Sequence, residues 1–259
     1  MGSAMTTVNG GQQLSYTDHG GDGPVVVLLH SFLMDVEMFA PQVAAFGADH
    51  RLIAVDERGH GGTPATAPFD YWDVARDVLG LLDHLRIDRA TVIGTSQGGF
   101  VALRMALTDP DRVTGIVALG TSAAAEDPQV AAAYRQLAEA WVANGPADQL
   151  VDTVAAICLG DYDATDWKAK WRTVDGDRFD RTLTALVERD SVLERLGEVT
   201  CPVLVLHGTA DAAYPVERGQ ELAAGVPKGQ YVAIDGGAHF LSLTHADAVQ
   251  PHLAAFLRG

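Results

Sequence analysis

The sequence contains little cysteine, and what it has is poorly placed for covalent or metal cross-links. Only two of its 259 residues are cysteine, Cys158 and Cys201. They lie far apart without a CxxC or metal-ligand spacing, which argues against a disulfide framework and against a zinc site. The scarcity of cysteine therefore favours a reducing cytoplasm and predicts no metal.

Positive charge and long hydrophobic runs are also scarce. Eighteen Lys and Arg residues against 34 Asp and Glu give a formal charge of -16, which repels phosphate backbones and anionic lipids. No apolar run approaches the ~18 residues of a membrane span, and the start MGSAMTTVNG lacks the features of a signal peptide. We expect a soluble protein without nucleic-acid or membrane partners. Whether it forms a homo-oligomer is left open.

Short β-branched runs alternate with amphipathic stretches of helix length, which predicts an α/β protein with a mostly parallel, doubly wound sheet. Strands are expected at Val25 to His30, Arg51 to Asp56, Ala90 to Gly94, Val113 to Gly120, Val203 to Gly208 and Gln230 to Ile234, with an antiparallel edge strand at Gln13 to Tyr16. Helices are expected at Asp35 to Phe46, Tyr71 to Leu85, Gln97 to Thr108, Val216 to Ala224 and Ala246 to Leu257.

A long, Ala-rich helical stretch interrupts this alternation after Gly120 and is too long for a simple crossover. We interpret residues 122–198 as a helical cap inserted after the sixth strand, with breaks at Asn144-Gly145-Pro146 and at Gly160. Residues 5–121 and 199–259 then form the core domain. Residues 1–4 precede a second methionine, are typical of an expression-vector remnant, and are excluded from the predicted fold.

The segment GTSQGG, residues 94–99, lies between an expected buried strand and an expected helix. This is the setting of a nucleophile elbow, a turn so sharp that the residues around the serine must be small. The alternative is a glycine-rich turn with an incidental serine, but the strand before it and the helix after it favour Ser96 as a nucleophile. Ser96 then lies at the positive end of a helix, where a developing oxyanion is stabilised.

A serine nucleophile needs a base within hydrogen-bond reach and an acid that orients the base. In this fold the chain order is nucleophile, acid, histidine, with both partners on loops after late strands. His239, after the last strand, is the expected base, and Asp211, after VLVLHG, is the expected acid. Glu126 and Asp127 are competing candidates for the acid.

The oxyanion hole is expected to combine the backbone N–H of Gln97 with that of Phe32 in the loop HSFL. His30 and His60 lie at strand ends near the site, where we expect them to brace loops. The segment DERGHG, residues 56–61, is interpreted as a structural loop with Arg58 in an internal ion pair.

The segments HSFLMD, DERGHGGT, GTSQGG, HGTAD and GGAHF, in this order across nearly the whole chain, resemble the α/β-hydrolase superfamily. The length, the helical insertion and the run LERLG before Cys201-Pro202 are similar to 3-oxoadipate enol-lactonases and related small esterases. One departure is the serine at position 31, where a glycine is common in the superfamily, although enol-lactonases also carry serine there.

Aromatic residues of the insertion provide the only indication of what the pocket accepts. They either line an apolar cavity or pack the cap helices together. On the first interpretation the substrate-binding residues are Leu33, Met34, Trp141, Trp167 and Trp171. No Lys or Arg is evidently placed for a substrate carboxylate, so an apolar, uncharged ester or lactone is expected.

These observations predict a serine hydrolase that cleaves a carboxylic ester or lactone by acyl transfer and requires no cofactor. Position 96 is serine, which excludes the aspartate nucleophile of dehalogenases and epoxide hydrolases. Two alternatives use the same fold. One is a cofactor-free perhydrolase of the haloperoxidase type, and the other is a hydrolase-like ligand receptor.

Overall fold

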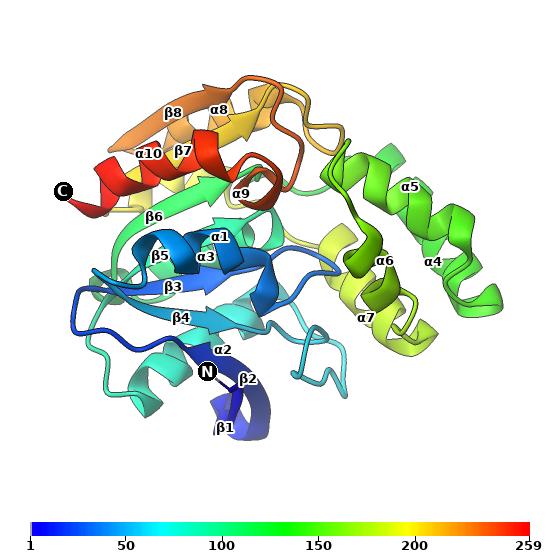
Figure 1. Ribbon diagram of the computed structural model, residues 1–259, viewed down its shortest axis with the longest axis horizontal. Coiled ribbons are helices and arrows are strands. Elements are labelled where there is room, and N and C mark those ends of the chain that lie inside the picture. The colour runs from blue at the N-terminus through cyan, green and yellow to red at the C-terminus, as the bar shows by residue number, and fades with distance from the viewer. Residues whose placement is uncertain (1) are drawn as a thin grey trace.

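The computed structural model describes residues 2–259, in which eight strands form one sheet (Figure 1). Their order across the sheet is β1-β2-β4-β3-β5-β6-β7-β8. The pairings of β1 with β2 and of β2 with β4 are antiparallel, and all the others are parallel. In chain order the strands are β1 (Ala4–Val8), β2 (Gln12–Asp18), β3 (Val25–Leu29), β4 (Arg51–Val55), β5 (Ala90–Thr95), β6 (Val113–Leu119), β7 (Val203–Gly208) and β8 (Gly229–Ile234).

Helices cover both faces of this sheet and bury its central strands. In Figure 1, α1 and α10 lie in front of the sheet, and α2, α3 and α8 lie behind it. Strands such as VVVLL and VLVLHG are almost entirely apolar, as expected where both faces of a sheet are covered. The predicted doubly wound α/β architecture is confirmed. These helices are α1 (Ala40–Phe46), α2 (Tyr71–His84), α3 (Gln97–Thr108), α8 (Val216–Gly225) and α10 (Ala246–Leu257).

Between β6 and β7 the chain forms a helical insertion, which Figure 1 places beyond the carboxyl ends of the parallel strands. The expected breaks occur at Gly145 and Gly160, which both have a positive φ. The division of the chain into a core and a cap stays a prediction. The insertion consists of α4 (Pro128–Asn144), α5 (Asp148–Leu159), α6 (Thr165–Trp171), α7 (Gly176–Val187) and the 3-10 turn η4 (Leu193–Glu198).

Three details of the sequence prediction are wrong. The antiparallel strand near Gln13 is not at the edge of the sheet, because β1 pairs with it on the outer side. This strand begins at Ala4, within the segment 1–4 that the prediction excluded from the fold. Met1 of that segment lies outside the described residues. The helix expected from Asp35 is a 3-10 turn, η2 (Val36–Phe39), followed by α1, because Pro41 has no N–H to continue a regular helical ladder.

Three further short elements complete the described residues. The helix α9 (Leu241–Thr244) was not predicted, since four residues carry no helical periodicity. The 3-10 turns η1 (Asn9–Gly11) and η3 (Pro110–Arg112) join strands and helices. No helix in residues 2–259 combines the length and the apolar character needed to cross a bilayer.

Candidate active site

Ser96 lies on a sharp turn between β5 and α3, with φ 49° and ψ -106°. A positive φ in a residue with a Cβ atom costs of the order of 1 kcal/mol or more, so the surrounding chain must enforce it. A Cβ atom at Gly98 would lie 2.1 Å from the carbonyl oxygen of Leu29, so only glycine permits the close approach of α3 to β3. The N–H of Ser96 donates to Leu119 O over 2.8 Å. The turn thus holds Ser96 at the carboxyl edge of the sheet.

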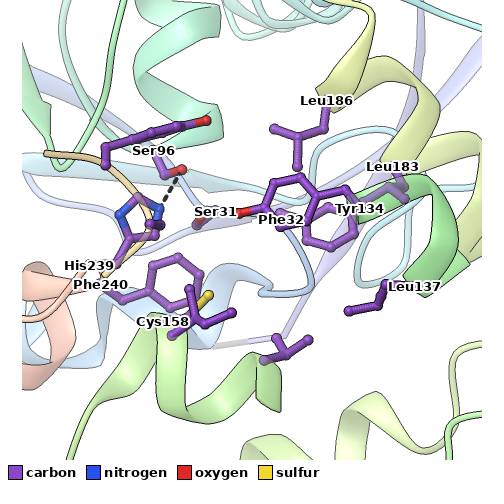
Figure 2. Close-up of a pocket in the computed structure, with 14 residues that line it drawn as sticks. Ser31, Phe32, Ser96, Tyr134, Leu137, Cys158, Leu183, Leu186, His239 and Phe240 are labelled. Carbon is purple, nitrogen blue, oxygen red and sulfur yellow. Dashed lines mark hydrogen bonds between the residues drawn. The ribbon is translucent and has the colours of Figure 1, made fainter. Parts of the chain in front are cut away.

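The structure brings the three side chains predicted to form a triad into one hydrogen-bonded chain. His239 Nε2 lies 2.9 Å from Ser96 Oγ, the contact drawn as a dashed line in Figure 2, and His239 Nδ1 lies 2.8 Å from Asp211 Oδ2. A carboxylate only accepts, so Nδ1 carries the hydrogen and Nε2 is free to accept the serine proton. Ser96 follows β5, Asp211 follows β7 and His239 follows β8, so three strands that end at the same edge of the sheet supply the chain.

Asp211 is fully buried, yet its surroundings keep it ionised. Burial by itself raises the pKa of a carboxyl, but the charge of His239 and hydrogen bonds from His207, His239 and the Tyr214 N–H outweigh it and hold the pKa of Asp211 well below its ordinary value. The other oxygen, Oδ1, accepts the N–H groups of Ala213 and Tyr214 at 2.8 and 2.9 Å. Asp211 can therefore stabilise a positive charge on His239.

The two competing carboxylates are occupied elsewhere. Glu126 Oε2 lies 3.0 Å from Arg189 Nη1 and accepts the Tyr214 hydroxyl at 2.9 Å, in a buried pair. Asp127 is the N-cap of α4 and accepts N–H groups of its first turn. Neither is hydrogen-bonded to His239, so the geometry favours Asp211 as the acid.

Two backbone N–H groups near Ser96 are left without a partner. Within residues 2–259, neither the N–H of Gln97 nor that of Phe32 has a hydrogen-bond acceptor. The loop that carries Phe32 is held in place, because Gly98 N donates to His30 O over 3.0 Å and His30 Nδ1 donates to Ser31 O over 2.7 Å. Free donors on a fixed backbone are what an oxyanion hole requires.

The expected bracing roles agree with the contacts. His30 Nε2 accepts the N–H of Glu57 at 2.9 Å, and His60 Nδ1 lies 2.9 Å from Arg58 O. Arg58 forms an ion pair with the buried carboxylate of Asp77. The loops after β3 and β4 are thus tied to each other and to α2.

Beneath Gln97 lies a buried polar chain that the sequence did not reveal. The Gln97 side chain donates to Glu57 Oε2 over 2.9 Å and accepts the Tyr71 hydroxyl at 3.1 Å. Burial, offset in part by the Gln97 hydrogen bond and reinforced by Asp56, raises the pKa of Glu57 to about 8. Glu57 therefore stays protonated at neutral pH. The sequence placed it in a structural loop but gave no sign that its carboxyl turns inward.

This raised pKa predicts a pH-dependent stability. An unfolded Glu57 ionises near its ordinary pKa of 4.5, whereas the folded one keeps its proton to about pH 8, so the folded state binds more protons between these values. The free energy of unfolding then falls with rising pH in this window, by up to about 1.4 kcal/mol per unit, and levels off above it. Glu57→Gln should remove this slope, as urea unfolding at pH 5, 7 and 8.5 would measure. The exposed Glu139→Gln serves as the control, and a Glu57→Gln effect that does not vary with pH would contradict the assignment.

A small apolar cavity opens in front of the Ser96–His239 pair and encloses about 50 Å³ (Figure 2). Three helices of the insertion each turn one face toward it, at three- or four-residue spacing. Ser31 Oγ is buried in its wall and has no hydrogen-bond partner within residues 2–259. Among the same residues, no Lys, Arg, Asp or Glu lines the cavity. The lining residues are Ser31, Phe32, Ser96, Tyr134, Leu137, Val154, Ile157, Cys158, Leu183, Leu186, Ala213, Tyr214, His239 and Phe240.

None of the five side chains assigned to substrate binding from the sequence lines this cavity, and their role in binding stays a prediction. Two of the tryptophans make packing and hydrogen-bond contacts instead. Trp141 stacks on Phe179 with ring centroids 4.1 Å apart, and Trp171 Nε1 donates to Leu33 O over 2.8 Å. Aromatic rings bury a large apolar area, so they contribute most to a small helical core such as that of the insertion. The five residues are Leu33, Met34, Trp141, Trp167 and Trp171.

No cluster of three or more His, Cys, Asp or Glu side chains in residues 2–259 is arranged to hold a metal ion.

Comparison with known proteins agrees with this architecture. A family model described as alpha/beta hydrolase fold matches residues 24–246. The chain is 28% identical over 242 residues to 3-oxoadipate enol-lactonase 1 of Acinetobacter baylyi, covering 90% of this chain and 89% of that protein. The crystal structure of the enol-lactonase from Burkholderia xenovorans LB400 matches with a TM-score of 0.90 and 28% identity, over 99% of this chain and 100% of the other. A thermophilic esterase from Thermogutta terrifontis matches with a TM-score of 0.88 and 25% identity, over 100% and 98%.

Proposed function

The chain belongs to the α/β-hydrolase fold family, and from this premise we propose that it is a serine hydrolase that cleaves an uncharged, apolar ester or lactone. The observation that carries the proposal is the hydrogen-bonded chain from Ser96 through His239 to Asp211, which opens on an apolar cavity. Enol-lactonases and an esterase among the similar proteins support ester or lactone hydrolysis as the reaction class.

The reaction we propose is acyl transfer in two halves. Ser96 Oγ attacks the carbonyl carbon while His239 Nε2 takes the hydroxyl proton, and the N–H groups of Gln97 and Phe32 donate to the oxyanion that forms. The ester C–O bond then breaks, and His239 returns the proton to the leaving alcohol. Water, deprotonated by His239, then attacks the acyl carbon; the bond from this carbon to Ser96 Oγ breaks, the acid is released, and His239 returns the proton to Ser96 Oγ. In a lactone the leaving alcohol stays attached to the acyl group.

Among the described residues, the cavity lining has no charged side chain, which favours a substrate different from the one in the name of the related enol-lactonase. An enol-lactone of 3-oxoadipate carries a carboxylate, which needs a cation or several donors where it is buried. Arg189, a buried cation whose guanidinium lies over the Tyr214 ring of the wall, is already paired with Glu126. A substrate carboxylate would therefore be left without a partner in this cavity.

A symmetrical diester tests both the reaction and this charge preference. Hydrolysis of dimethyl succinate should stop at the monomethyl ester, because the second step would bring an unpaired carboxylate into the cavity. Such burial costs at least about 3 kcal/mol, so the second step should be at least about 100-fold slower. Gas chromatography of the two esters over time measures the ratio, with Ser96→Ala as the blank. Equal rates would contradict the charge preference, and no Ser96-dependent hydrolysis of any neutral ester would contradict the function.

A further inference from the structure

A second histidine contacts the acid of the proposed triad. His207, the penultimate residue of β7, has a fully buried side chain, and its Nε2 lies 3.2 Å from Asp211 Oδ2 and 3.0 Å from Tyr214 O. The same oxygen, Oδ2, lies 2.8 Å from His239 Nδ1. One carboxylate oxygen of Asp211 is thus shared by two imidazole rings, of which only one reaches Ser96.

The contacts of His207 determine where its hydrogen lies. A carbonyl and a carboxylate can only accept, so the Nε2 atom that faces both must carry a hydrogen. On the other side of the ring, Nδ1 is buried without a partner among the described residues. A Cβ atom at Gly219 would lie 2.7 Å from this Nδ1, so glycine is needed there for the ring to fit. The ring is therefore locked with one N–H directed at Asp211 and Tyr214.

We propose that His207 is a positioning residue that holds Asp211 Oδ2 in place and, by donating to it, limits how strongly Asp211 stabilises a proton on His239. The inference rests on the proposed roles of Ser96, His239 and Asp211. A hydrogen bond to an ionised carboxylate takes up part of its charge, and the charge left on Oδ2 is what stabilises the imidazolium of His239. Without the His207 donor, His239 should keep its proton to a higher pH and Asp211 should be less well oriented.

The other groups that face this pair do not obscure the effect. Burial raises the pKa of Tyr214, whose ring packs edge-on against His239, and of Cys158 in α5, so both stay neutral between pH 5 and 9. Burial likewise raises the pKa of Tyr134 in α4. Glu126 reaches the pair only through the Tyr214 hydroxyl and is paired with Arg189.

Glu57, under Gln97, is the one nearby group with a pKa of about 8, so its ionisation affects only the alkaline limb of a pH profile. The acid limb therefore reports on the proton of His239 and on the charge of Asp211 that stabilises it.

Two substitutions separate donation from ring packing. In His207→Gln the side-chain amide can place an N–H where Nε2 lies, whereas His207→Met fills a similar volume without any donor. We expect the acid limb of kcat/KM on p-nitrophenyl acetate to move to higher pH by about 0.5 to 1 unit in His207→Met, with kcat lowered about tenfold. His207→Gln should restore the limb to within about 0.2 unit of wild type, because the amide again donates to Asp211. We expect this even where the melting temperature of the variant is lowered.

The outcomes distinguish this inference from the proposed function. Equal shifts in His207→Gln and His207→Met, or no shift in His207→Met, would overturn the role of His207 and leave that of His239 intact. A wild-type profile without an acid limb between pH 5 and 8 would instead contradict His239 as the base. Should His207→Met fail to fold, His207→Asn provides the second variant without a donor at the Nε2 position, because its shorter amide reaches only the Nδ1 side of the ring; the same shift is expected.

Discussion

Ser96→Ala is expected to lower kcat/KM on a neutral ester by at least about 10⁴-fold while the fold is preserved, because no other hydroxyl is hydrogen-bonded to His239 Nε2 in the described residues. Glycines at positions 94 and 98 set the close packing of the turn, so we expect removal of the Ser96 hydroxyl to leave the turn intact. Steady-state kinetics measures the loss of kcat/KM, and circular dichroism checks that the fold is preserved.

Ser31→Ala is the matched control for this loss. Ser31 is also a buried serine in the wall of the same cavity, and its hydroxyl has no hydrogen-bond partner. Its removal breaks no hydrogen bond in the protein, so the rate should change by less than about tenfold. A comparable loss in both variants would mean that the cavity wall, rather than nucleophilic attack by Ser96, limits the reaction.

Asp211→Asn is expected to lower kcat by about 10³ to 10⁴-fold, with the overall structure retained. An amide donates where the carboxylate accepted, so His239 would be held with its hydrogen on Nε2 and could no longer take the proton of Ser96. The loss of negative charge would also remove the stabilisation of the imidazolium that forms during attack. Stopped-flow or steady-state rates on p-nitrophenyl acetate measure the effect.

Glu126→Gln is the contrasting variant, because Glu126 was the competing acid. Removing one charge of the buried Glu126–Arg189 pair should cost about 3 kcal/mol or more of stability and lower the melting temperature. Its effect on kcat should stay below about tenfold at a temperature where the variant is folded, since it acts on His239 only through the Tyr214 ring. A larger kcat loss in Glu126→Gln than in Asp211→Asn would reverse the assignment of the acid.

The parts of the site that could be predicted from the sequence are those fixed by strand ends. Parallel strands finish at the same edge of a sheet, so residues in the loops that follow β5, β7 and β8 meet even though Ser96 and His239 are 143 positions apart. The tight packing of Gly98 against Leu29 shows why the motif around Ser96 carries so much information: a side chain there would collide with the neighbouring strand.

The parts that could not be predicted depend on how separate elements face one another. Helical spacing places Tyr134, Leu137 and Trp141 on one face of α4, but the sequence does not indicate that the first two line the cavity while Trp141 packs on Phe179. Similarly, Glu57 lies two residues beyond β4 in a loop rich in polar residues, and nothing local distinguishes an inward carboxyl from a solvated one. Both outcomes are set by long-range packing.

Covalent labelling is the most direct test of Ser96 as the nucleophile. A fluorophosphonate reacts with a serine activated by a base, and trypsin would release residues 90–104, a peptide that contains Ser96 as its single serine. We predict one adduct per chain, located in this peptide in wild type and absent from Ser96→Ala. An adduct on another peptide, or equal labelling of the two proteins, would contradict the account.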